Sequence, residues 1–133
     1  MHSTISNLLN IQSLVDHCYE LAVNGEGELA QAGLQTALKE FYNTSYKPLP
    51  LAKDILEIAG RASCLISVYF DFQYAEHFYL RGEKKEARQW LCKAKQDARQ
   101  RKLFINGKIK KMKKHYKDKM PLFSFFRVRV KQP

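Results

Sequence analysis

Residues 51–81 limit the fold of this chain more than any other part, because they form one long stretch without a proline. Pro50, directly before them, suits the first turn of a helix. Residues 64–72 in their middle are apolar on nearly every side, and a helix that is apolar all round is buried. We therefore expect one long, buried central helix. The β-branched and aromatic residues of 64–72 also suit a buried strand, which periodicity alone does not exclude.

Two shorter helices are expected before the central one. Apolar residues recur at spacings of three and four over residues 5–22 and again over residues 29–42, which is the helical period. The glycine-containing segment 24–27 ends the first helix, and the loop around Pro48 follows the second. The short connection between these two helices predicts that they form an antiparallel pair.

A fourth helix follows the central one. Gly82 is expected to end the central helix, and the fourth helix begins near Glu83. Its apolar residues recur at helical spacing and are Ala87, Leu91, Ala94 and Ala98. Trp90 lies one residue off this apolar stripe.

Two interpretations are open for the chain beyond Ala98. In the first, the helical spacing continues through a basic helix with a break at Gly107, which the helix propensity of residues 110–114 favours. In the second, the segments on either side of Gly107 form a β-hairpin, because Asn-Gly is a strong hairpin signal. Residues 125–130 then alternate like a strand, as a short β-like tail or as part of that hairpin.

These patterns predict an all-α fold, a bundle of four to five helices packed as antiparallel pairs. A chain of 133 residues of which 45% are hydrophobic can bury a core as a single domain. We expect residues 1–119 to form this helical domain. Residues 120–133 are expected to form a basic and aromatic C-terminal tail.

Charge is divided unevenly along the chain. The formal net charge is +10, yet residues 1–80 contain four basic and nine acidic residues, whereas residues 81–133 contain nineteen basic and four acidic ones. Such asymmetry predicts that the second half contacts a polyanion or an acidic protein surface. The alternative is a solvated basic face packed against the protein's own acidic half.

The basic residues of the second half concentrate in one stretch. The candidate binding residues are Arg99, Arg101, Lys102, Lys108, Lys110, Lys111, Lys113, Lys114, Lys117 and Lys119. Such side chains neutralise phosphates, and interleaved aromatic rings such as Phe104 and Tyr116 can stack on unpaired bases. The stretch therefore suits an acidic patch on a protein partner or the backbone of a nucleic acid. An anionic membrane surface, with the three phenylalanines of residues 123–126 inserted, is a third alternative.

Two segments share an order of small and large residues around a turn. In residues 68–101 this order is Ala75 and Phe78, Gly82 at the turn, then Ala87, Leu91 and Ala94. In residues 11–44 it is Cys18 and Leu21, Gly25 at the turn, then Ala30, Leu34 and Ala37. Small residues at such positions let two helices approach closely.

This order resembles the tetratricopeptide repeat, a helix-turn-helix unit of about 34 residues. Gly25 and Gly82 lie further apart than in a regular array, and Asp71 stands where that repeat usually carries a tryptophan-like residue. The resemblance covers about half of the chain. It implies a scaffold that binds a peptide or another protein in a groove between helices, and such repeats are seldom enzymes. It does not assign individual groove residues.

The sequence offers few catalytic patterns. His17 and Cys18 are adjacent on a helix and point apart, and metal-binding spacings such as Cys-x-x-Cys do not occur, so we expect neither a metal site nor a cofactor. Glu76 and His77 are a candidate acid–base pair, but a surface histidine beside a buried run is the simpler interpretation. We therefore expect a protein that is not an enzyme.

The cysteines and the N-terminal residues indicate the cellular compartment in which the protein is expected to reside. Cys18, Cys64 and Cys92 form neither a close pair nor an even set, which favours a reducing environment. The first residues lack the basic region and the apolar run of a secretory signal. We expect a cytoplasmic interaction module, an adaptor, chaperone or inhibitor, whose basic half docks on an acidic partner. The alternative function is nucleic-acid binding through residues 99–119.

Overall fold

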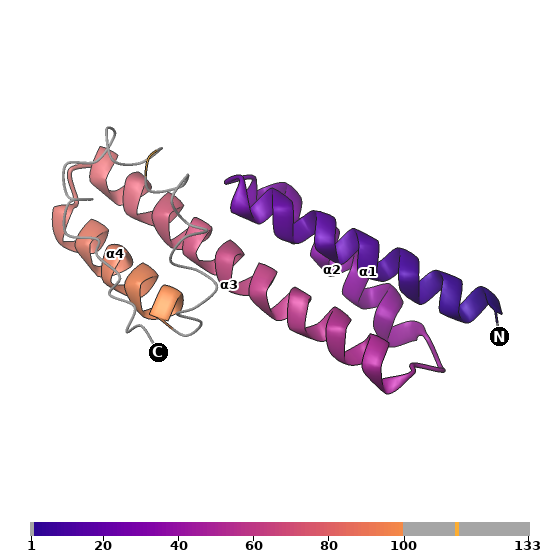
Figure 1. Ribbon diagram of the computed structural model, residues 1–133. Helices are drawn as coiled ribbons and strands as arrows, with labels where there is room; N and C mark the ends of the chain where they lie inside the picture. The colour runs from indigo at the N-terminus through magenta and orange to yellow at the C-terminus, as the bar shows by residue number, and fades with distance from the viewer. Residues whose placement is uncertain (1, 100–113, 115–133) are drawn as a thin grey trace.

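The structure is a computed structural model that describes residues 2–99 and Lys114. These residues form the four helices α1 (His2–Val23), α2 (Gly27–Asn43), α3 (Leu49–Leu80) and α4 (Lys84–Arg99), as Figure 1 shows. The described part contains no strand, so the all-helical expectation is confirmed there. The strand alternative for residues 64–72 is wrong, because they lie within α3.

Several expectations fall on residues that the structure does not describe. The choice between a basic helix and a hairpin around Gly107 lies outside the described residues. The same holds for the strand-like segment 125–130 and for the boundary between the helical domain, residues 1–119, and the tail, residues 120–133. These expectations stay predictions.

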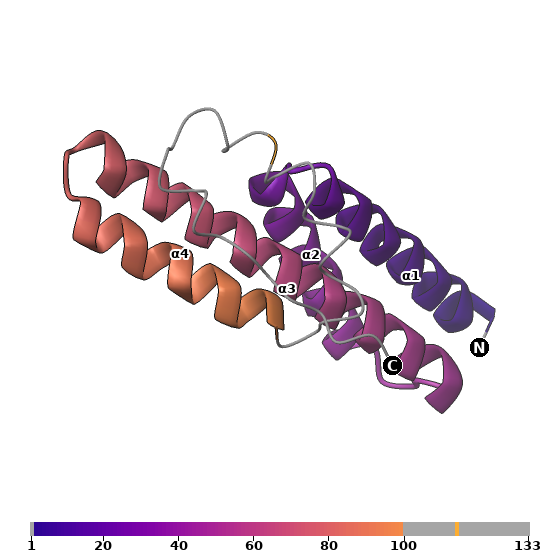
Figure 2. The same ribbon diagram turned by 60° about the vertical axis from the view of Figure 1, so that its left-hand side comes forward.

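Helix α3 is the axis of the described part of the molecule. It has 32 residues, which at 1.5 Å per residue gives a length of about 48 Å. Helices α1 and α2 lie against its N-terminal half, and α4 lies alongside its C-terminal half (Figures 1 and 2). Helix α3 therefore packs against α1 and α2 along one half and against α4 along the other.

The core follows the apolar spacing of the sequence. Helix α4 buries the expected stripe of Ala87, Leu91, Ala94 and Ala98. Helix α2 buries Ala30, Leu34, Ala37 and Phe41. Alanine recurs in both stripes because a small side chain lets one helix axis approach another closely.

The apolar middle of α3 is not covered on every side. Leu65 and Ile66 are buried, but Tyr69 and Phe70 are only half-buried, so the expectation that the apolar stretch 64–72 is buried on every side is wrong at those two positions. Because α1 and α2 pack towards one end of α3 and α4 packs towards the other, the described helices leave one strip of its surface as a groove. Phe70 lies on this strip together with the exposed Ser67.

Gly25 and Gly82 end α1 and α3, as expected. Their φ angles are 85° and 79°, a left-handed conformation that glycine adopts without steric cost. The N–H of Glu26 donates to the carbonyl of Leu21 at 2.9 Å, and the residue after Gly82 donates back into α3 in the same way. Both helices therefore end in a Schellman cap.

Tyr69 packs directly on Gly27 at the start of α2. A Cβ added at position 27 would overlap the Tyr69 ring, so α2 and α3 come this close because residue 27 has no side chain. We expect Gly27→Ala to lower the free energy of unfolding by about 1 to 3 kcal/mol, the usual cost of overpacking a fitted core. Urea denaturation measures this loss.

The variant Tyr69→Leu provides the matched control for this overlap. The double variant Gly27→Ala/Tyr69→Leu lacks the ring that the added Cβ would meet. Its loss in free energy of unfolding should therefore be clearly smaller than the sum of the losses of the two single variants. If the double variant lost as much free energy of unfolding as the two single variants together, the added methyl group at position 27 would not collide with the Tyr69 ring.

Candidate binding groove between α2 and α4

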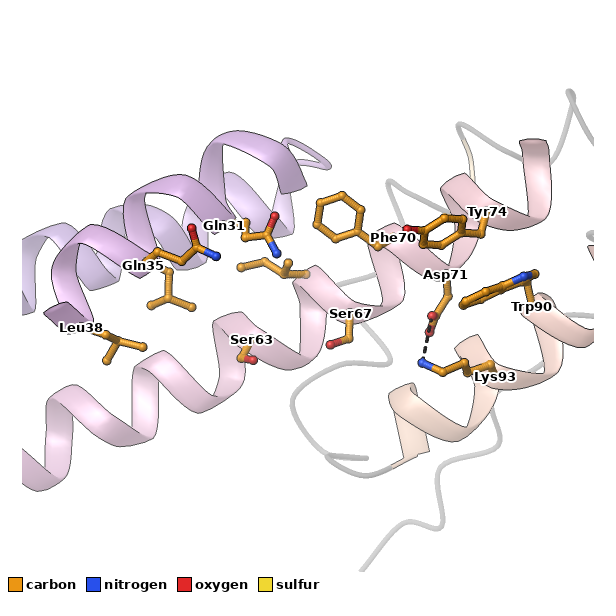
Figure 3. A pocket seen from close by; sticks show the side chains of 12 residues that line it. Gln31, Gln35, Leu38, Ser63, Ser67, Phe70, Asp71, Tyr74, Trp90 and Lys93 are labelled. Carbon is orange, nitrogen blue, oxygen red and sulfur yellow. Dashed lines mark hydrogen bonds and ion pairs between the residues drawn. The ribbon is translucent and has the colours of Figure 1, made fainter. Parts of the chain in front are cut away.

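A groove of about 600 Å³ lies on the open side of α3, with α2 along one side and α4 at one end (Figure 3). Helix α3 forms its floor with Ser63, Ile66, Ser67, Phe70, Asp71 and Tyr74. Helix α2 adds Gln31, Leu34, Gln35 and Leu38, and α4 adds Trp90 and Lys93. We refer to it as the α2–α4 groove.

The floor of the groove arises from the helical period of α3. Ser63, Ser67, Phe70 and Tyr74 are separated by four, three and four residues, which places them on one helix face. This face combines hydroxyl groups with aromatic rings inside a mainly apolar stretch. Such a mixture of apolar surface and a few polar groups is typical of a binding site.

A pair of stacked rings bounds the α4 end of the groove. The ring centroids of Tyr74 and Trp90 are 4.5 Å apart, and the ring planes differ by 25°. The ammonium of Lys93 lies 5.6 Å from the Trp90 ring centroid, within the range of a cation–π contact. Figure 3 shows the three side chains together at this end. The rings also join α3 to α4.

Asp71 is the buried polar residue of the described core. Its residue surface is 3% exposed. Its Oδ1 lies 3.4 Å from Nζ of Lys93, and the same Nζ lies 3.3 Å from Oδ2 of Asp97 on α4. The second oxygen of Asp71, Oδ2, is buried without a hydrogen-bond partner. The Lys93 ammonium is thus shared between two carboxyl groups.

This environment changes the protonation of Asp71. Burial raises the pKa of Asp71 to about 8 with help from the neighbouring Asp97 carboxylate, although the Lys93 ammonium opposes the rise. Burial disfavours the charged form of an acid, and a second negative charge nearby acts in the same direction. At pH 7 the Asp71 carboxyl group is therefore mostly protonated.

The tetratricopeptide resemblance implied a groove between helices, but none of the residues that line this groove was predicted from the sequence. One signal was present, because Asp71 is the charged residue of the otherwise uncharged segment 64–72. A carboxylate is seldom fully buried unless it is paired, so an aspartate in such a segment marks a special position. The contribution of Trp90 from another helix could not be seen without the three-dimensional arrangement.

The predicted basic site lies mostly beyond the described residues. Arg99 is exposed at the end of α4, Lys114 is exposed as well, and neither lines the groove. The remaining predicted residues lie outside the described part: Arg101, Lys102, Lys108, Lys110, Lys111, Lys113, Lys117 and Lys119. Helix α4 also exposes Lys84, Lys85 and Arg88, so α4 itself carries basic surface.

The other candidate chemical groups lie apart from the groove. His77 is exposed, and its Nε2 lies 3.4 Å from Nη1 of Arg81. Cys18 is buried, and burial raises the pKa of its thiol, which suits a packing residue better than a nucleophile. Within residues 2–99 and Lys114, no cluster of three or more histidine, cysteine, aspartate or glutamate side chains is placed to hold a metal ion.

No protein-family model, curated protein or solved structure matches the chain. Among the described helices, none is both long enough and apolar enough to cross a membrane. What the groove can do therefore follows from its own chemistry.

Proposed function

We propose that this protein is a small interaction module without enzymatic activity, an adaptor, chaperone or inhibitor. It holds a segment of a protein partner in the α2–α4 groove, and its basic C-terminal half docks on an acidic surface of that partner. The observation that carries the proposal is the open groove on α3, because it has a buried carboxyl group on its floor and stacked rings at its end. Convergent polar groups in an apolar cleft are the usual features of a ligand site.

The α2 side and the α3 floor of the groove suit a peptide. On α2, the exposed amide side chains of Gln31 and Gln35 can donate to and accept from a peptide backbone. On α3, the exposed hydroxyls of Ser63 and Ser67 can do the same, while Phe70 offers apolar surface for a side chain. A partner segment that lies along α3 would therefore meet both kinds of contact.

We also propose that the helices form antiparallel pairs with tetratricopeptide-like packing. In both units the small, large and small positions are buried, and this burial supports such packing. These positions are Ala30, Leu34, Ala37, Ala87, Leu91 and Ala94. Units of this kind serve as interaction scaffolds. The positive surface that begins on α4 supports an acidic docking surface on the partner, because complementary charges steer association.

A variant with a large side chain in the groove tests the proposal that a partner segment binds there. Ser67 is exposed on the floor, so Ser67→Trp should fill the groove without disturbing the core, whereas Ser13→Trp places the same ring on exposed α1 surface. We expect proteins that the parent chain and Ser13→Trp retain from an extract of the source cells to be lost from Ser67→Trp. Quantitative mass spectrometry of the retained proteins measures this. Equal retention by both variants would refute groove binding.

The basic surface of α4 favours a second candidate function, binding to a nucleic-acid backbone. If this function holds, replacing Lys110, Lys111, Lys113 and Lys114 together by Gln should weaken binding to all DNA and RNA sequences alike. The log–log salt slope should become shallower by roughly 3 to 4 units, because each lysine releases counterions. Lys39→Gln/Lys53→Gln, at exposed lysines in the acidic half, is the control. An unchanged slope would exclude this function.

A further inference from the structure

The α4 end of the groove has an excess of negative charge whenever both of its carboxyl groups are ionised. Asp71 and Asp97 provide two carboxyl groups, and Lys93 provides one ammonium. The ammonium lies 3.4 Å and 3.3 Å from them, longer than the roughly 2.7–2.9 Å of a strong charged hydrogen bond. The Lys93 side chain is also 54% exposed, so water competes for it. Lys93 therefore balances only part of the negative charge of the ionised pair.

The oxygen that Lys93 leaves unpaired is Oδ2 of Asp71. The Asp71 side chain is 4% exposed, and this oxygen has no hydrogen-bond partner. A buried acceptor without a donor is unfavourable, and a buried negative charge is more so. The carboxyl group consequently needs either a proton or a second cation.

The surroundings of Asp71 suit a planar cation. Figure 3 shows the carboxyl group at the α4 end of the groove, with Ser67 on one side and the Trp90 ring on the other. Tyr74 is 49% exposed and stacks on Trp90. Aromatic rings attract a guanidinium group, which donates hydrogen bonds in its plane and stacks on rings more readily than an ammonium.

We propose that this end of the groove is a subsite for an arginine side chain of the bound partner segment, whose guanidinium donates to Oδ2 of Asp71 beside the Tyr74–Trp90 pair. The proposal rests on the proposed function, in which the groove holds such a segment. Lys93 moves aside as the guanidinium enters and keeps Asp97 as its partner, because the two residues are one turn apart on α4. The subsite then contains two cations and two carboxylates.

Binding at this subsite releases a proton. The groups that face Asp71 are Lys93 and Asp97 of α4, with Tyr74 beside it on α3, while α2 lines the groove with uncharged side chains. In the free groove the Asp71 carboxyl holds a proton up to about pH 8, the pKa that burial and Asp97 produce. The guanidinium binds the ionised form, so its affinity rises with pH up to about 8 and is constant above it.

The probe pair for the test is N-acetyl-arginine methylamide and N-acetyl-citrulline methylamide, which have similar shapes and differ in charge. Trp90 is the single tryptophan of the chain, so its indole N–H signal in the NMR spectrum of the labelled full chain reports on this end of the groove. At pH 8.5 we expect a saturable shift with the arginine probe and an affinity at least about tenfold lower for citrulline, which corresponds to about 1.4 kcal/mol.

Asp71→Asn is the deciding variant, because it removes the charge and keeps the shape. We expect it to bind the arginine probe no better than the citrulline probe, and to lose the rise in affinity between pH 6.5 and 8.5 that the parent chain shows. Equal affinity of the parent chain for both probes would overturn the subsite, and so would an unchanged arginine affinity in Asp71→Asn or a flat pH profile.

These results separate the subsite from the proposed function. If Ser67→Trp loses the partner proteins but the two probes bind the parent chain equally, the groove binds a partner and the arginine subsite is wrong. If the arginine probe is preferred but Ser67→Trp retains every protein that Ser13→Trp retains, the cation site exists and the groove is not where a partner protein binds.

Discussion

Replacing Leu65 by Ala is expected to lower the free energy of unfolding by about 2 to 5 kcal/mol, the range for truncating a fully buried leucine. Leu65 is 0% exposed in the middle of α3, the helix that both groups of neighbours share. The cavity left by the substitution has packed helices around it, so it cannot collapse freely. Chemical denaturation followed by circular dichroism measures the loss.

Leu56→Ala is the matched control for this substitution. Leu56 lies on the same helix but is 42% exposed, so its truncation should cost far less. Equal losses for the two variants would contradict the placement of Leu65 in the shared core.

The stability of the protein should depend on the protonation of Asp71. Its pKa is about 8 in the folded chain against an ordinary value of 3.8, so between these two pH values the folded chain binds a proton that the unfolded chain does not. Stability therefore falls as the pH rises from about 4 to about 8, by up to about 1.4 kcal/mol per pH unit from this group. Above about pH 8 this contribution is constant.

Asp71→Asn removes this dependence because an amide does not titrate. We expect the variant to match the parent chain near pH 4 and to exceed it in free energy of unfolding at pH 8. The difference between the two, measured by denaturation at each pH, isolates Asp71 from the other titrating groups. Asp97→Asn, which removes the neighbouring carboxylate, should make the dependence smaller. A parent chain and an Asp71→Asn variant with parallel pH profiles would contradict the raised pKa.

The helices could be predicted because their signals are local. The spacing of Ala87, Leu91, Ala94 and Ala98 depends on the period of one helix, and Gly25 and Gly82 act within a single turn. Such features are encoded within a few residues of sequence. The long central helix could be predicted in the same way, since no proline follows Pro50 within it.

The residues that line the groove could not be predicted, because they depend on which side of α3 the neighbouring helices leave uncovered. Phe70 is as apolar as Leu65 and Tyr69 has a large apolar ring, so the period of the helix gives no reason to expect their burial to differ from that of Leu65. Their half-burial follows from where α2 and α4 end along α3. The stack of Tyr74 on Trp90 likewise joins residues of two helices. Only Asp71 gave a signal in the sequence, as a charge inside an apolar segment.

The function proposed for this protein requires that the α2–α4 groove holds a segment of a protein partner. Photo-crosslinking inside the source cells tests this most directly, with a small diazirine amino acid placed at position 67 in the groove or at position 13 on the exposed side of α1. We predict that position 67 crosslinks to one short segment of a partner protein and that position 13 does not. The same crosslinked proteins from both positions, or crosslinks from position 67 to nucleic acid alone, would contradict groove binding.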